Sequence, residues 1–294
     1  MPKVALTHGK WTVELAPEIG GSISRCDYDG QHVLRPAVQQ DDPLAGEARG
    51  MACYPLVPFS NRIEHGRFEF AGQSVQLPKN MGDHPHALHG QGWRGVWHVV
   101  SQAQNRAAIA YTHEADAWPW RYEARQVFEL GDAGLTVRLG VTNLTDRPMP
   151  AGLGLHPYFL ATDATLTTGL TYLWECTSEQ IPIQRVDLPP ELDFSHGRKV
   201  AEHDLDHCFG GWSRHATVEW PGKPYRVHMD GSPSLQYFIL YTPRGQDFFC
   251  AEGVENMNNA INWLPRAVST GLTILQPGAS HEITTVFKVE AVSA

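Results

Sequence analysis

The stretch RQVFELGDAGLTVRLGVTNL, residues 125–144, decides the fold class of this chain. Its second half alternates between apolar and polar positions, and one face is formed by Leu135, Val137, Leu139 and Val141. A period of two predicts a β-strand with one buried face. A Gly-Asp turn separates this segment from an equally strand-like segment before it. We therefore expect residues 125–144 to form a β-hairpin.

The same alternation recurs along the chain, in WTVEL (11–15), ATVEW (216–220), SLQYFILY (234–241) and EITTVFKV (282–289). The 27 glycines and 21 prolines are spread between such runs, as expected for many short strands joined by turns. No window of helical length carries a sustained apolar stripe, and no repeat of propeller length is present. We expect one all-β domain over residues 1–294, a large antiparallel sandwich or barrel, with long functional loops at 36–60 and 185–213.

Charge and cysteine usage exclude several classes of protein. The formal net charge is −9, which argues against a surface that neutralises nucleic-acid phosphates. The N-terminal segment has no apolar run of signal-peptide length, and no stretch approaches the roughly 20 apolar residues of a membrane span. Five scattered cysteines without a CxxC pair indicate reduced thiols. We expect a cytoplasmic protein with no nucleic-acid or membrane partner, as a monomer or homodimer.

The stretch HPHALHGQGWRGVW, residues 84–97, raises the question of a metal site. His84 and His86 share one face of an extended segment, but no carboxylate follows them nearby. His203 and His207 have helical spacing within a sequence that does not predict a helix. Because transition-metal sites need three or four converging ligands, we expect no metal and no cofactor. Trp93 and the WPW segment (118–120) could stack on a sugar or fill a core, and Trp97 is expected in the core.

Acid–base chemistry is the remaining possibility, because GxSxG is absent and the cysteines lie in apolar strings that would raise a thiol pKa. Glu252 closes an apolar run that begins at Phe248. A partly desolvated carboxylate there would act as a base near neutral pH, whereas a carboxylate in water would merely end the strand. The stretch alone favours the second interpretation, because perturbed carboxylates are the minority. The other candidates are His89, His156, Asp206 and Glu255.

Six segments, taken together and in order, resemble the aldose 1-epimerase (galactose mutarotase) family over roughly residues 10–290. They are NRIEHGRFEFAGQSVQLPKN (61–80), HALHG (86–90), LGLHPYF (153–159), LDHCF (205–209), FFCAEGVENMNNAIN (248–262) and LQPGASHEITTVFKV (275–289). The resemblance implies a large antiparallel β-sandwich of the galactose mutarotase type, with its site in a groove on the concave face. It also implies a small-molecule sugar as the substrate.

The resemblance assigns a role to each matching residue. Arg62 and His89 would contact the sugar, and Asp206 would hold its hydroxyl groups. His156 would protonate the ring oxygen O5, and Glu252 would take the proton from the hydroxyl on C1. His84 and His86 would then be loop residues at the rim of the groove.

Two departures from the family pattern leave the substrate open. Glu252 is followed by Gly253 where proline is common, which is expected to loosen a turn and makes Glu255 a rival for the base. Leu160 stands where asparagine is common. A hexose-6-phosphate mutarotase would need extra cations, for which Arg67, Arg94 and Arg214 are available. A mutarotase for an acidic or modified sugar and a non-catalytic sugar-binding protein are further alternatives. A glycosidase would normally need two carboxylates.

Overall fold

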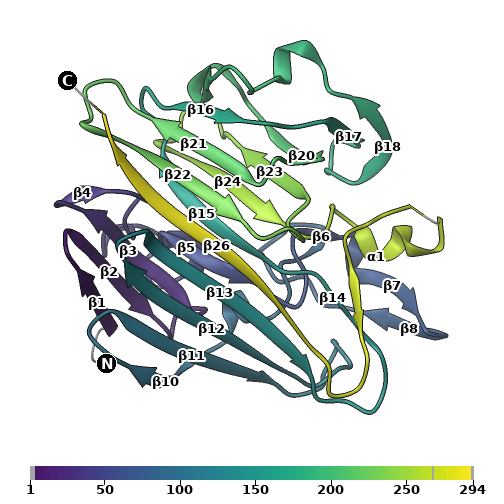
Figure 1. The fold of residues 1–294 in the computed structure, drawn as a ribbon. Helices are drawn as coiled ribbons and strands as arrows, with labels where there is room; N and C mark the ends of the chain where they lie inside the picture. Colours follow the sequence, from purple (N-terminus) through teal and green to yellow (C-terminus); the bar gives the residue numbers. More distant parts are fainter. Residues whose placement is uncertain (1–3, 267, 293–294) are drawn as a thin grey trace.

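The computed structural model describes residues 4–266 and 268–292, and it consists of two large antiparallel sheets (Figure 1). One hydrophobic core cluster contains residues of both sheets, such as Val13, Phe128 and Phe249. The expected large antiparallel β-sandwich is therefore confirmed.

The first sheet has eleven strands, and it carries the residues of greatest interest here. In spatial order it contains β1 (Val4–His8), β2 (Trp11–Ala16), β3 (Ser22–Tyr28), β5 (Cys53–Leu56), β15 (Gly154–Leu160), β24 (Phe248–Val254), β23 (Tyr237–Tyr241), β20 (Asp206–Gly210), β17 (Tyr172–Cys176) and β18 (Pro182–Asp187), with β4 (Gln31–His32) paired to β3.

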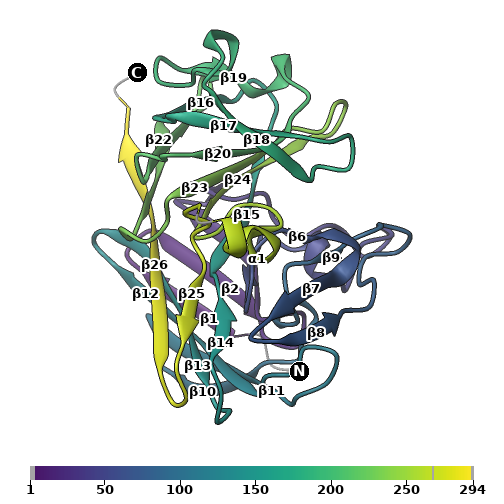
Figure 2. The ribbon, with the colours of Figure 1, turned by 90° about the vertical axis from the view of Figure 1, so that its right-hand side faces the viewer.

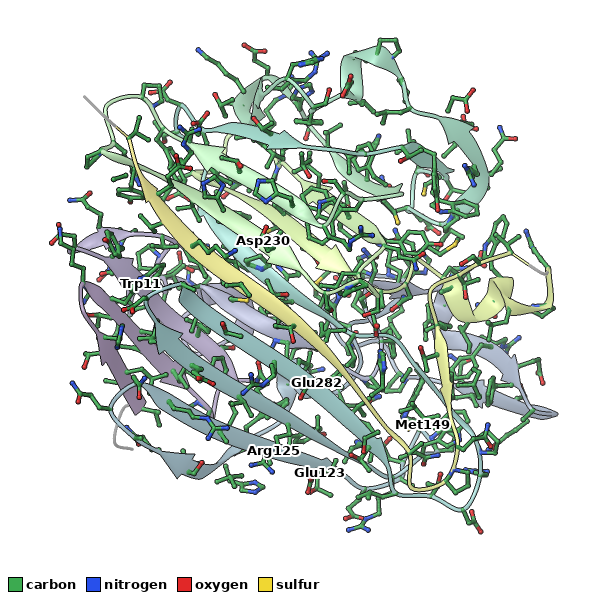
Figure 3. The ribbon with its side chains drawn as sticks, in the orientation of Figure 1. Trp11, Glu123, Arg125, Met149, Asp230 and Glu282 are labelled. Atoms are coloured by element: carbon green, nitrogen blue, oxygen red, sulfur yellow. The ribbon has the colours of Figure 1, made fainter. Side chains whose placement is uncertain are left out.

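The second sheet has nine strands, and the long β26 runs through its middle (Figure 1). In spatial order it contains β10 (His98–Gln102), β11 (Arg106–His113), β12 (Tyr122–Gly131), β13 (Gly134–Asn143), β26 (Ser280–Ala291), β22 (Tyr225–Gly231), β21 (His215–Glu219), β16 (Thr165–Thr168) and β19 (Arg198–Lys199). These strands include the predicted hairpin, because Gly131 pairs with Gly134 at the turn between β12 and β13. Glu123, Arg125 and Glu282 are exposed on the outer face of this sheet (Figure 3).

Short elements complete the described part of the chain. The small strand pairs are β14 (Met149–Ala151) with β25 (Thr273–Leu275), β6 (Arg62–Ile63) with β9 (Ala87–Leu88), and β7 (Arg67–Phe70) with β8 (Gln73–Gln76). The helices are α1 (Ala260–Trp263), η1 (Ala48–Gly50), η2 (Glu64–Gly66), η3 (Gly92–Arg94), η4 (Pro190–Leu192), η5 (Val200–Glu202) and η6 (Leu264–Arg266). Figure 2 shows the β6–β9 and β7–β8 pairs grouped beside α1. Over the described residues, no helix has the length and apolarity of a membrane span.

The two segments expected to be long loops contain strands, so those predictions are wrong in part. The segment 36–60 includes β5, which lies inside the first sheet between β3 and β15. All four residues of β5 are buried, so it lacks the alternation that reveals a half-exposed strand. The segment 185–213 includes β19 and β20, and β20 also lies inside the first sheet.

The tryptophans of the histidine-rich stretch and of the WPW segment are all buried. Trp97, Trp118 and Trp120 belong to the core cluster, which confirms the expectation for Trp97. Trp93 is 4% exposed, and its ring stacks on that of Tyr54 at 5.8 Å. It therefore supports an aromatic neighbour and has little surface of its own to offer a ligand.

Candidate active site

Neighbouring strands of the first sheet place three of the predicted residues on one face. Strands β15, β24, β23 and β20 are consecutive in the sheet, and they carry His156, Glu252 and Asp206. In β24, Phe249 and Ala251 belong to the core between the sheets. Successive side chains of a strand point to opposite faces, so Glu252 points away from that core. The same alternation directs His156 and Asp206 to this outer face.

Arg62 and His89 reach the same face from the short β6–β9 pair. Arg62 on β6 pairs with Leu88 on β9, so His89 follows directly beside it. The backbone N–H of His89 donates to the carbonyl of Asn61 (2.9 Å), and the backbone N–H of Asn61 donates to Nδ1 of His89 (3.1 Å). Because Nδ1 accepts this bond, the neutral imidazole carries its proton on Nε2. His89 can therefore act as a hydrogen-bond donor.

All five predicted site residues line one cavity of about 460 Å³. They are Arg62, His89, His156, Asp206 and Glu252. The rest of the wall is formed by the turn 178–180 between β17 and β18 and by nine single residues: Arg49, Tyr54, Asn61, Met81, His84, Leu88, Tyr158, Ile239 and Tyr241. The structure thus brings together residues that are separated by up to 190 positions in the sequence.

The two other histidines of the 84–89 stretch differ from each other. His84 lines the cavity, in agreement with a place at its rim. His86 is completely buried, and its Nδ1 accepts a hydrogen bond from the backbone N–H of His65 (3.1 Å). The expectation that His86 lies at the rim is therefore wrong. Within the described residues, no group of three or more His, Cys, Asp or Glu side chains is arranged to hold a metal ion.

Glu252 and His156 form the centre of the cavity wall. The Glu252 Oε1 atom lies 3.3 Å from Nε2 of His156, and the two residues are only 2% and 7% exposed. Glu252 lies within a strand and is buried, so the interpretation as a strand end in water is wrong. Among the described residues, neither Oε2 of Glu252 nor Nδ1 of His156 has a hydrogen-bond partner. An unpaired buried polar atom costs about 1–3 kcal/mol, so such atoms indicate a place for a ligand or water.

Burial shifts the pKa values of this pair in opposite directions. The pKa of Glu252 is raised well above its usual range, first by burial and then by the negative charge of Asp206, while Arg62 opposes the shift. The pKa of His156 is lowered to about 3, mainly by burial, and the positive charge of Arg35 acts in the same direction. Both shifts favour the neutral forms of the pair, a protonated carboxyl group and an unprotonated imidazole.

Arg62 and Asp206 form an ion pair at the cavity wall. Nη2 of Arg62 donates to Oδ2 of Asp206 (2.5 Å), and Nη1 donates to Oδ1 of Asp206 (3.4 Å) and to the side chain of Asn61 (2.9 Å). The fork geometry fixes both side chains, and the acceptor sites that remain on the carboxylate can bind hydroxyl groups. The same cation lowers the pKa of His89, which is held well below its usual range mainly by burial.

Two tyrosines that sequence reasoning missed enclose His156. The imidazole stacks on Tyr54 at 4.5 Å and on Tyr158 at 4.9 Å. Tyr158 follows His156 by two positions, so the period of the strand alone would have placed it on the same face. Tyr54 pairs with His156 across β5 and β15, and this register could not be inferred without the sheet order.

Gly253 does not loosen a turn, contrary to expectation, because it lies inside β24. A Cβ atom at this position would lie 2.3 Å from the ring of Trp212. Glycine is thus required by the close approach of an indole to the strand, and not by flexibility. The rival glutamate, Glu255, is bound on the other side: Oε2 accepts from the backbone N–H of Leu153 (2.9 Å), and Oε1 lies 2.6 Å from Nε2 of His281.

Comparison with known proteins agrees with this architecture. The family model for aldose 1-epimerase matches residues 2–288. The uncharacterized protein YphB of Escherichia coli (strain K12) is 31% identical, over 97% of this chain and 98% of its own. The crystal structure of a putative aldose 1-epimerase from Escherichia coli K12 superimposes with a TM-score of 0.90 at 29% identity, with 99% of each chain covered. A galactose mutarotase-like protein from Clostridium acetobutylicum shares the fold, with a TM-score of 0.88, 20% identity, and coverage of 98% and 95%. This chain belongs to the aldose 1-epimerase family.

Proposed function

We propose that this protein interconverts the α and β anomers of a free aldose by opening and reclosing the sugar ring. The 3.3 Å separation of Glu252 and His156 at the wall of a polar cavity carries the proposal. Ring opening removes a proton from O1 and delivers one to O5. Both oxygens are bonded to C1, so the base and the acid must be close neighbours. A carboxyl group and an imidazole in near contact meet this requirement.

The proton transfers balance without a further reactant. Glu252 takes the proton of the O1 hydroxyl, the C1–O5 bond breaks, and His156 gives its proton to O5. The aldehyde rotates about C1–C2 and presents its other face. O5 then attacks C1 and returns its proton to His156, while Glu252 returns its proton to O1. The pair therefore ends each turnover in the state in which it began.

The opposed pKa shifts suit this chemistry. O5 is a weak base, so it needs a strong acid, and a lowered pKa makes protonated His156 such an acid. The O1 hydroxyl is a weak acid, and a raised pKa makes the Glu252 carboxylate a stronger base. The reactive form requires the proton to move from Glu252 to His156. Hydroxyl groups of the sugar that donate to Glu252 would favour this form, because they stabilise the carboxylate.

We propose that Arg62, His89 and Asp206 bind the sugar. Asp206 offers acceptor sites for hydroxyl groups, and Arg62 fixes its orientation. The Nε2–H group of His89 is available as a donor, and the imidazoles of His89 and His156 lie edge to face at 5.4 Å. His89 would therefore bind an oxygen next to the reacting centre.

The charges of the cavity favour a neutral sugar over a phosphorylated one. Both guanidinium groups among the described lining residues are paired, Arg62 with Asp206 (2.5 Å) and Arg49 with Glu47 (2.6 Å). Glu179 and Glu252 add further carboxyl groups. The arginines that could have served a phosphate (Arg67, Arg94 and Arg214) do not line this cavity.

Polarimetry with fresh α-D-glucose, α-D-galactose, other aldoses, uronates and hexose 6-phosphates tests the proposal. We expect faster mutarotation of at least one neutral aldose, with the acceleration lost in His156→Ala. Acceleration of phosphorylated sugars alone would replace the neutral substrate with the alternative one. If no sugar reacts and sugars only bind, the protein is a sugar-binding member of the family and the proposal fails.

A further inference from the structure

Arg35, which follows β4, is a buried cation with no obvious structural counter-charge. The residue is 6% exposed. Among the described residues, no carboxylate lies within ion-pair distance of its guanidinium, and Nε has no hydrogen-bond partner. Nη2 donates to the backbone carbonyls of Met51 (2.7 Å) and Arg49 (3.3 Å). A buried charge without a counter-charge is strongly unfavourable for folding, so its presence calls for an explanation.

The guanidinium lies on the aromatic stack that contains His156. Its Cζ atom is 4.2 Å from the ring centre of Tyr158, and the other neighbouring ring is Phe248 at 5.0 Å. The backbone N–H of Arg35 also donates to the carbonyl of Tyr158 (2.8 Å). Tyr158 in turn stacks on His156, so a single aromatic ring separates the cation from the imidazole. Tyr54 contacts another side of His156, and its ring centre lies 6.2 Å from that of Tyr158, so the three rings form a cluster and not a single column.

We propose that Arg35 is a positioning residue for the acid–base pair: it fixes Tyr158 against the face of His156 and opposes positive charge on the imidazole. The inference rests on the proposed function for its catalytic meaning. A cation behind the acid makes the protonated imidazole less stable, and the proton is therefore released more readily to O5. The attraction between the guanidinium and the face of the tyrosine ring offsets part of the unfavourable burial.

The other groups around His156 do not supply this effect. The titratable or charged groups that face it are Tyr54 on β5, Tyr158 on β15, Glu252 on β24, His89 after β9 and Arg35 after β4. Both tyrosines are neutral, because burial raises the pKa of each well above its usual range. His89 is neutral as well, because its pKa is lowered. Arg35 is the permanent positive charge of this group.

The pH dependence of mutarotation in Arg35→Gln and Arg35→Lys separates charge from packing. Glutamine removes the charge and, because its amide nitrogen stands at the place of Nε, also the hydrogen bonds of Nη2 to the backbone carbonyls. Lysine keeps the charge but not the planar group. We expect the acid limb of the kcat/KM profile to move upward by about one pH unit in Arg35→Gln, because a unit charge one ring away changes a pKa by that order. Arg35→Lys is expected to have its acid limb at the same pH as the native protein. Arg35→Met is a second neutral variant if Arg35→Gln does not fold.

A matched control is Arg185→Met, which removes another arginine stacked on a tyrosine. Arg185 lies on β18 with Cζ 3.8 Å from the Tyr172 ring, and it is exposed and outside the cavity. Its profile should equal that of the native protein. An unchanged acid limb in the neutral Arg35 variants would overturn the inference. Arg35 would then have only a structural role, as the donor to the backbone carbonyls of Arg49 and Met51. An equal displacement in Arg35→Lys would also overturn it, because the charge would then not be the cause.

A second readout needs no substrate. NMR of the histidine ring nitrogens follows the protonation of His156 in the ligand-free protein, and we expect protonation at higher pH in Arg35→Gln than in the native protein. If no sugar is turned over, this titration alone decides the inference, and the failure belongs to the proposed function. If His156 protonates identically in both proteins, the inference fails whatever the activity.

Discussion

Two glutamate–histidine pairs, whose glutamates lie three residues apart in the same segment, differ in hydrogen bonding and in burial: the side chain of His156 is 9% exposed and that of His281 is 23% exposed. In the first pair, Glu252 and His156 are 3.3 Å apart and each keeps a polar atom without a partner among the described residues. In the second, Glu255 and His281 are 2.6 Å apart, and the free oxygen of Glu255 accepts a backbone hydrogen bond. Both carboxylate oxygens of Glu255 have partners, so the Glu255–His281 pair leaves no carboxylate acceptor for a ligand. In the Glu252–His156 pair, Oε2 of Glu252 and Nδ1 of His156 have no partner among the described residues, which is unfavourable for folding but leaves these atoms available to a ligand.

Their electrostatics differ accordingly. The pKa of His281 is raised, chiefly by its hydrogen bond to Glu255, so this pair favours the charged imidazolium. The pKa of His156 is lowered by burial, so the first pair favours neutral partners. The hydrogen bond to Glu255 thus favours the charged form of His281, whereas the burial of His156 itself favours its neutral form.

The largest expected effect comes from Glu252→Gln. We expect mutarotation to fall by about 10²–10⁴-fold, because the amide cannot take the O1 proton. The melting temperature should stay the same or rise, since a buried ionisable group is removed. Polarimetry and thermal unfolding measure the two quantities. If Glu255→Gln abolishes turnover while Glu252→Gln does not, the base has been assigned to the wrong glutamate.

Glu255→Gln is expected to act on stability instead. Loss of a charged hydrogen-bond acceptor shared by His281 and the backbone of Leu153 should reduce the free energy of unfolding by about 2 kcal/mol. Urea unfolding of this variant and of Glu252→Gln under identical conditions gives the comparison. Equal free energies of unfolding for the two variants would show that the Glu255–His281 pair has no special structural role.

The smallest effect is the pH dependence of stability, where the two histidines have opposite signs. The pKa of an unfolded histidine is about 6.5, and burial lowers the pKa of folded His156 to about 3. As the pH falls, the unfolded state therefore binds a proton first. The contribution of His156 to the free energy of unfolding is complete above the unfolded pKa and is lost as the pH falls below it. Between about pH 7.5 and about pH 5.5 we expect the His156 contribution to the free energy of unfolding to decrease by about 1 kcal/mol, and His156→Gln should remove this pH dependence. His281 has a raised pKa, so its contribution is present below the unfolded pKa and is lost as the pH rises through the folded one. Urea unfolding at several pH values should show a flatter acid side in His156→Gln and a flatter alkaline side in His281→Gln.

Much of the fold was accessible from the sequence because half-exposed strands alternate. The spacing of apolar residues and the Gly-Asp turn together predicted the hairpin of β12 and β13. Strand β5 could not be predicted in this way, because all of its residues are buried and its sequence shows no alternation. The position of Glu252 within a strand was misjudged for the same reason, since its neighbours on both faces of β24 are buried.

The sequence predicted only part of the site. The five residues found by motif do line one cavity, whereas their roles remain a proposal. Tyr54 and Arg35 carry no local signal, because their proximity to His156 arises only from strand register and from the path of the chain after β4. Sequence patterns report what a residue is and which face it occupies, but the partner on the next strand depends on long-range pairing.

The contact between Gly253 and Trp212 has a consequence for engineering of the site. The indole lies so close to β24 that the residue after the proposed base cannot gain a side chain while the tryptophan stays where it is. The sizes of residues 212 and 253 are therefore coupled: a larger residue at position 253 requires a smaller or displaced residue at position 212. Redesign of the strand beside Glu252 has to change both positions together.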